Sequence, residues 1–143
     1  MFFYFLRILL YHSEMISYLN LMDIEHIRES LNLEDAEKKF NYKGGLELTL
    51  DMVQDLYNDI ESNKEKIIAK SYYLLKEITK GHFFNGGNKR TALLTARVFL
   101  NLNNYSLNYD NGEGFLLTIS IFYDRLNEKK VKEWLVNHME AKQ

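Results

Sequence analysis

The chain has 143 residues, which is enough for one hydrophobic core and too few for two ordinary domains. It has no cysteine, so disulfides, a thiolate nucleophile and cysteine-based zinc sites are excluded. The four histidines lie far apart without a metal-binding spacing, and no metal site is predicted from them. The net charge is -2, which does not provide the basic surface that general nucleic-acid binding requires. We expect a cytoplasmic protein whose substrate is a small molecule or a protein.

The first eleven residues, MFFYFLRILLY, are apolar except for Arg7. This run is too short to span a bilayer, which takes roughly 20 residues, and it lacks the basic region and cleavage site of a signal peptide. We expect an apolar amino-terminal extension over residues 1–14 and a single domain over residues 15–143. The extension would pack on its own domain or on a second subunit, as in a homo-oligomer. The alternative is that the natural start is Met15, which would make the extension dispensable.

Apolar side chains at helical spacing predict a helix near residues 24–31 with Asp23 as its cap, and a second helix that starts at Thr49. A third stripe ends at Gly81, a residue typical of helix ends. Further helical stripes fall within residues 91–102, 115–123 and 131–139. The fold class is therefore predicted to be all-α.

Residues 41–50, NYKGGLELTL, interrupt the helical pattern. Gly44 and Gly45 form a turn dipeptide, and the three leucines that follow alternate with polar residues. This pattern suits a short strand in a hairpin. The alternative is a plain loop between two helices.

The nonapeptide HFFNGGNKR, residues 82–90, directly precedes a strongly helical stretch. Gly86 and Gly87 allow a tight turn, and Asn88 is suited to cap the helix. The first amides of that helix lack intrahelical partners and carry the positive end of its dipole. An anion is therefore favoured at the point where Lys89 and Arg90 also lie.

His82 stands at the start of this nonapeptide and is the candidate general base. A free imidazole has a pKa near 6.5, which suits removal of a proton from a Ser, Thr or Tyr hydroxyl. Arg90 is suited to grip a phosphate with two hydrogen bonds, while Lys89 acts as a point charge. Phe84 is expected to anchor the loop in the core, and Thr91 to serve the first helical turn.

This nonapeptide resembles the signature of the Fic/Doc family, HxFx[DE][GA]N[GK]R. The matching positions are His82, Phe84, Gly87, Asn88, Lys89 and Arg90. The resemblance implies a Fic/Doc-like helical bundle with a short β-hairpin flap before the motif. Chain order places this target-binding flap at Lys43, Gly44, Gly45 and Leu46, where it would pair with the target by strand addition.

The resemblance also implies an activity, the transfer of a phosphoryl or nucleotidyl group from ATP or another nucleoside triphosphate to a protein hydroxyl. Lys89 and the following Thr-Ala resemble the Doc branch, a toxin that passes on the terminal phosphate and is paired with an antitoxin. Elongation factor Tu, a translation factor, is the family's precedent for a target. An inhibitory helix with the pattern [ST]xxxE[GN] has only a weak counterpart at Ser30 to Glu34, so a separate inhibitor is expected.

Gly86 departs from the signature, which places Asp or Glu there to hold magnesium against the phosphates. Without this carboxylate, magnesium use is left open, and Gly86→Asp is predicted to improve both magnesium-nucleotide binding and transfer. The alternative function is a degenerate family member that binds a nucleotide or a protein and has no transferase activity.

Overall fold

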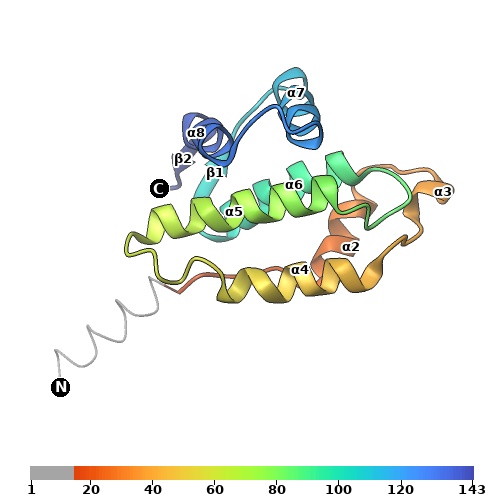
Figure 1. Cartoon of the computed structure of the whole chain (residues 1–143), viewed down its shortest axis with the longest axis horizontal. Helices are drawn as coiled ribbons and strands as arrows, with labels where there is room; N and C mark the ends of the chain where they lie inside the picture. The colour runs from red at the N-terminus through yellow and green to blue at the C-terminus, as the bar shows by residue number, and fades with distance from the viewer. Residues whose placement is uncertain (1–14) are drawn as a thin grey trace.

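The computed structural model describes residues 15–143, so the predicted extension over residues 1–14 lies outside the described part (Figure 1). The helices are α2 (Leu21–Glu29), α3 (Asp35–Lys38), α4 (Lys43–Asp55), α5 (Asn63–Lys80), α6 (Asn88–Leu102), α7 (Asn111–Phe122) and α8 (Glu128–His138). Two short strands, β1 (Tyr105–Leu107) and β2 (Met139–Ala141), pair antiparallel. The prediction of an all-α fold is confirmed. No helix within residues 15–143 is long and apolar enough to cross a bilayer.

Helices α5 and α6 form the centre of the molecule and pack against each other along their length (Figure 1). Helices α2 and α4 lie on one side of this pair, and α7 and α8 lie on the other. The central pair supplies much of the buried core, including Ile68, Leu75, Ile78, Ala96, Phe99 and Leu100. The link between α5 and α6 is therefore held by two well-packed helices, and this link is the nonapeptide.

Helix α5 ends where the sequence predicted, with Gly81 as its C-cap. A β-carbon at this position would lie 2.4 Å from the ring of Phe83, so only glycine lets that ring pack against the helix end. His82 follows at once, at the carboxyl end of an 18-residue helix.

Two predicted helix caps are wrong. The cap of α2 is Asn20, whose side chain accepts from the amide of Asp23, while the Asp23 carboxylate accepts from the Asn20 amide. Asp23 is thus the second member of a capping box. Thr49 lies inside α4, where its hydroxyl donates to the carbonyl of Gly45 at 2.9 Å. Both residues are frequent at helix starts, and sequence alone does not distinguish these neighbouring roles.

The hairpin expected over residues 41–50 is also wrong, because residues 43–55 form α4. Leu46 and Leu50 are buried at helical spacing, whereas Leu48 is 56 % exposed and so does not share their face. Gly45 serves close packing instead of a turn, since a β-carbon there would lie 2.5 Å from the Tyr42 ring. The proposed flap residues Lys43, Gly44, Gly45 and Leu46 form the first turn of this helix. Their role in target binding stays a prediction, without the strand that motivated it.

Candidate functional site

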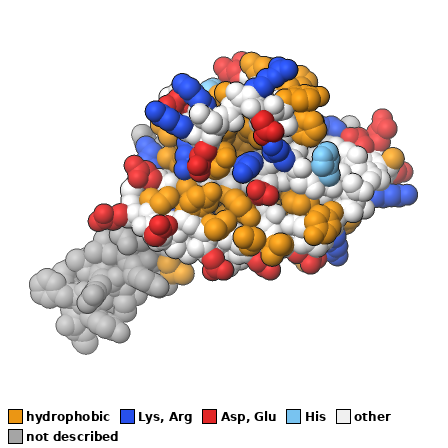
Figure 2. All heavy atoms as spheres, viewed as in Figure 1, with side chains coloured by type: hydrophobic (Ala, Val, Ile, Leu, Met, Phe, Trp, Pro, Cys, Tyr) orange, Lys and Arg blue, Asp and Glu red, His pale blue; other side chains and the backbone are white. Residues whose placement is uncertain are grey.

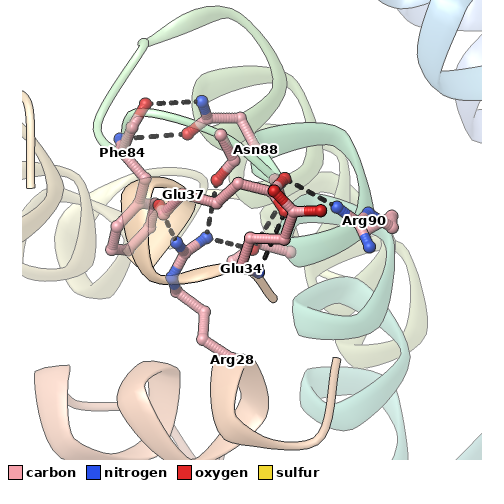
Figure 3. Close-up of polar contacts among 9 residues, drawn as sticks. Arg28, Glu34, Glu37, Phe84, Asn88 and Arg90 are labelled. Atoms are coloured by element: carbon pink, nitrogen blue, oxygen red, sulfur yellow. Dashed lines mark hydrogen bonds and ion pairs between the residues drawn. The ribbon is translucent and has the colours of Figure 1, made fainter. Parts of the chain in front are cut away.

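The turn from α5 into α6 is closed by a pair of hydrogen bonds from one side chain. The Asn88 amide donates to the carbonyl of Phe84 at 2.8 Å and accepts from the Phe84 N–H at 3.1 Å (Figure 3). The N-cap is Gly87, with φ of +72°, and Asn88 is the first helical residue. The predicted cap role of Asn88 is therefore wrong, and its side chain instead fixes the loop as a ring.

Helix α6 begins with backbone groups free for an external anion. Its first ladder bond runs from the Thr91 N–H to the Gly87 carbonyl at 2.9 Å, and the Thr91 hydroxyl donates to the same oxygen at 2.7 Å. The amides of residues 88–90 precede this bond and have no partner within the helix. Lys89 and Arg90 extend from the same turn, so charge and backbone amides favour an anion together.

A cavity of about 730 Å³ opens between this turn and α7. One wall is residues 85–90, and α7 contributes Asn111, Phe115 and Thr118. Sequence analysis missed this second wall, because the three α7 residues carry no recognisable motif. Gly114 lets α7 approach closely, since a β-carbon there would lie 2.5 Å from the Leu93 side chain.

His82 is exposed and has a φ of +51°, in the left-handed region. Its ring meets the ring of Phe122 edge to face, with the centroids 5.9 Å apart. The Lys89 ammonium lies 4.1 Å from the centroid of the same Phe122 ring. Phe122, the last residue of α7, thus contacts both the candidate base and a cation that lines the cavity. An ion pair between Lys80 and Asp124 ties the ends of α5 and α7 together beside it.

Arg28 on α2 is a site residue that sequence analysis did not find. Its guanidinium is buried and donates to the Thr91 hydroxyl at 2.8 Å, to the Gly86 carbonyl at 3.2 Å and to the Glu37 carbonyl at 2.8 Å. It also lies 3.5 Å from the centroid of the Phe84 ring. Burial lowers the pKa of Arg28 to about 10, which keeps it charged at neutral pH. Arg28 therefore joins the loop and the first turn of α6 to α2 and α3 (Figure 3).

Glu37 on α3 brings a carboxylate to the loop. Its Oε2 lies 2.9 Å from Nη2 of Arg90, and its Oε1 accepts from the Glu34 N–H at 3.1 Å (Figure 3). The side chain packs on Gly86, where a β-carbon would lie 2.8 Å from Cγ of Glu37. The position that lacks an acid in the nonapeptide therefore faces an acid from another element.

The weak counterpart of an inhibitory helix at Ser30 to Glu34 does not form one helix. Ser30 caps the end of α2, Asn32 has a φ of +53°, and Glu34 precedes α3. The first and last residues of the pattern thus belong to different elements.

The donor set can be tested against magnesium. Within residues 15–143 there is no group of three His, Cys, Asp or Glu side chains placed to hold an ion. Magnesium at nucleotide sites needs only one or two carboxylates and takes its other ligands from phosphates and water. The single carboxylate of Glu37 beside Gly86 and Arg90 meets this smaller requirement.

The expected loop anchor and helix residue are found where they were predicted. Phe84 is 2 % exposed within the core, and Thr91 is fully buried. The structure also gathers Gly86, Gly87, Asn88, Lys89 and Arg90 on one wall of the cavity.

Comparison with known proteins supports the resemblance of the nonapeptide to the Fic/Doc signature. No curated protein was found to match the chain. The family model of the Fic/DOC family matches residues 8–100, which cover well over half of the sequence and include α2 to the greater part of α6. Membership of this family suggests transfer of a nucleotide-derived group to proteins, and its members generally use a nucleoside triphosphate. The chain belongs to the Fic/DOC family.

Proposed function

We propose that the chain transfers the terminal phosphoryl group of ATP, or of another nucleoside triphosphate, to a hydroxyl of a target protein. The observation that carries this proposal is the cavity of about 730 Å³ beside the amino-terminal end of α6. Lys89 and Arg90 line it, and the His82 ring packs against Phe122, the same ring that the Lys89 ammonium contacts.

The residues have complementary tasks in this reaction. The target hydroxyl attacks the γ-phosphorus, its proton passes to the His82 imidazole, and the bond to the β,γ-bridging oxygen breaks as the nucleoside diphosphate leaves. Lys89, Arg90 and the free amides of α6 offset the charge on the phosphates. A resident magnesium ion would add a further positive charge at the phosphates, with Glu37 as its protein ligand.

The same site has a second direction in which the nucleotide can lie. Attack at the α-phosphorus would transfer the nucleotidyl group and release pyrophosphate, which is the outcome that family membership alone suggests. Lys89 in place of glycine supports the terminal phosphate, because the residues resemble the Doc branch. We extend the proposal to a Doc-like cytoplasmic toxin with a translation factor as target and a separate antitoxin.

The wall on α7 supports a nucleotide better than free phosphate. Phe115 lines the cavity and is 63 % exposed, which leaves its ring available to a planar base. Asn111 and Thr118 add polar groups to the same wall. A nucleoside placed along α7 would set its phosphates at Lys89 and Arg90.

The test is incubation with ATP labelled in parallel at the α- and γ-phosphate, with candidate targets that include elongation factor Tu. We expect γ-label on the target and a loss of about 100- to 10,000-fold in His82→Asn. Asparagine is chosen because it tolerates the positive φ of position 82. His26→Asn, at an exposed position on α2, is the matched control. Label from the α-phosphate would establish nucleotidyl transfer, and bound nucleotide without transfer to any target would favour a binding module.

A further inference from the structure

We propose that Glu37 is the protein ligand of a magnesium ion that enters with the nucleotide. This inference rests on the proposed nucleotide site. It assigns to α3, an element outside the nonapeptide, the carboxylate that the loop itself does not have. The inference depends on three observations: the position of Glu37, the space left by the missing side chain at Gly86, and the charges at the cavity.

The Glu37 carboxylate is held in place by both of its oxygens. Oε1 accepts from the Glu34 N–H at 3.1 Å, and Oε2 lies 2.9 Å from the Arg90 guanidinium. The Glu37 backbone is fixed as well, because its carbonyl accepts from Arg28. The side chain remains 29 % exposed and contacts Arg90, which lines the cavity (Figure 3).

Gly86 provides the space that this carboxylate occupies. A β-carbon there would lie 2.8 Å from Cγ, 3.0 Å from Oε2 and 3.1 Å from Cβ of Glu37. Any side chain at position 86 would therefore displace Glu37. The φ of Gly86 is not in the positive region, so backbone strain gives no separate reason for glycine here. The shape of the loop and the position of Glu37 depend on each other.

The charges explain why an ion is needed. Arg90 and Lys89 line the cavity, and a polyphosphate bound there would bring its negative oxygens close to the Glu37 carboxylate. Like charges at this distance repel unless a cation lies between them. A magnesium ion satisfies both groups, because it binds one or two carboxylates together with phosphate oxygens and water. No described group of three acidic or histidine side chains would hold the ion without the nucleotide.

Arg90 can change partners when the nucleotide binds, from Glu37 to the phosphate oxygens. Without nucleotide it neutralises Glu37. When phosphate binds, the guanidinium can turn its paired donors to the phosphate oxygens, and Oε2 of Glu37 becomes free for the ion. Glu37 and Arg90 thus each have a partner of opposite charge, both without the nucleotide and with it.

The test is calorimetric titration with a non-hydrolysable ATP analogue, in EDTA and again with magnesium. In the wild type, magnesium is expected to tighten binding at least about tenfold. In Glu37→Gln, which keeps the shape and removes the charge, this gain is expected to fall below about twofold, while binding in EDTA is as tight as in the wild type or tighter because Arg90 is released. Asp35→Asn removes an exposed carboxylate from the same helix and should keep the wild-type gain.

A Glu37→Gln variant with the full magnesium gain would overturn the inference, as would an equal loss of the gain in Asp35→Asn. A wild type that binds the analogue without any magnesium gain would overturn it too, while leaving the proposed function in place. A wild type that binds no analogue under either condition would overturn both.

Discussion

Gly86 is the residue at which the chain departs from its family's signature, and the structure supplies a reason. The glycine leaves room for Glu37, which packs against it and pairs with Arg90. The prediction that Gly86→Asp improves magnesium use requires space for a new side chain at this position. That space is filled by the Glu37 carboxylate from α3.

We therefore predict that Gly86→Asp destabilises the folded protein. The new β-carbon would lie 2.8 Å from Cγ of Glu37, and the two carboxylates would repel. The free energy of unfolding should fall by about 1–3 kcal/mol, a usual cost of overpacking. Adding Glu37→Ala to Gly86→Asp removes Cγ and the carboxylate of Glu37 and should recover part of this loss. Urea unfolding of the single and double variants measures both effects, and an unchanged midpoint in Gly86→Asp would contradict the prediction.

Phe115 and Leu116 allow a second prediction at the scale of single residues. Both are well exposed, at 63 % and 66 %, but only Phe115 lines the cavity. Figure 2 shows apolar side chains gathered over α7 on this face. Phe115→Ala should weaken binding of the ATP analogue by about 1–3 kcal/mol if the ring stacks on the base. Leu116→Ala removes a similar exposed apolar group from the neighbouring position and should leave the dissociation constant unchanged. Equal affinities in the two variants would show that the base lies elsewhere.

At the scale of elements, the loop between α5 and α6 is held in place by hydrogen bonds from other elements. Backbone hydrogen bonds join it to residues 39–42: the Asn85 N–H donates to the Lys39 carbonyl at 2.9 Å, and the Phe83 carbonyl accepts from Asn41 at 2.8 Å. Arg28 adds hydrogen bonds from α2. The extended segment beside the nonapeptide is thus residues 39–42, just before the helix that replaces the expected hairpin.

Arg28→Met tests this support. Methionine keeps much of the side-chain length but leaves the Gly86 carbonyl, the Thr91 hydroxyl and the Glu37 carbonyl without their buried donor. We expect a loss of about 2–4 kcal/mol in the free energy of unfolding, together with weaker binding of the ATP analogue. Arg125→Met, at an exposed position after α7, is the control and should change neither quantity. A normal affinity in Arg28→Met would show that the loop keeps its shape without α2.

The sequence predicts the elements that have a local signal. The stripe that ends at Gly81 identified α5, because helical spacing and a terminal glycine act together. Residues 43–55 have two compatible patterns, since Leu46 and Leu50 fit both alternation and a spacing of four residues. Tertiary packing decided between them: Gly45 lies against the Tyr42 and Phe83 rings, and that contact cannot be deduced from the neighbouring residues.

Only the part of the candidate site that is contiguous in sequence could be predicted. The nonapeptide identified the wall formed by residues 85–90, because all its residues are contiguous. Arg28, Glu37 and Phe115 come from three other helices and reach the site only through the fold. The one local signal for Arg28 was its place beside Ile24 and Ile27, a charged residue within an apolar face. Such a residue is buried at a cost and is expected to have several partners.

For the whole molecule, the most telling buried group is Lys70, whose side chain is fully enclosed by the protein. Its ammonium donates to the Val53 carbonyl, the Asn58 side chain and the Tyr18 hydroxyl, each at 2.8 Å, and to the Gln54 carbonyl at 3.2 Å. One residue of α5 therefore binds the end of α4 and the segment before α2. Lys70 lies in the amino-terminal half of α5 and does not line the cavity, so it stabilises the framework away from the site.

Lys70 also gives a prediction for stability against pH. Burial lowers its pKa from 10.5 to about 8, so between these values the unfolded chain binds more protons than the folded protein. Stability from this group therefore rises with pH, by about 1 kcal/mol from pH 7 to pH 9. Lys70→Met should be less stable at both values, because the carbonyls of Val53 and Gln54 lose their donor, and it should lack this rise. Urea unfolding of both proteins at pH 7, 8 and 9 measures the difference in unfolding free energy, which is expected to widen with pH. A difference that stays constant would mean that Lys70 remains fully protonated in the fold across this range, held by hydrogen bonds strong enough to outweigh its burial.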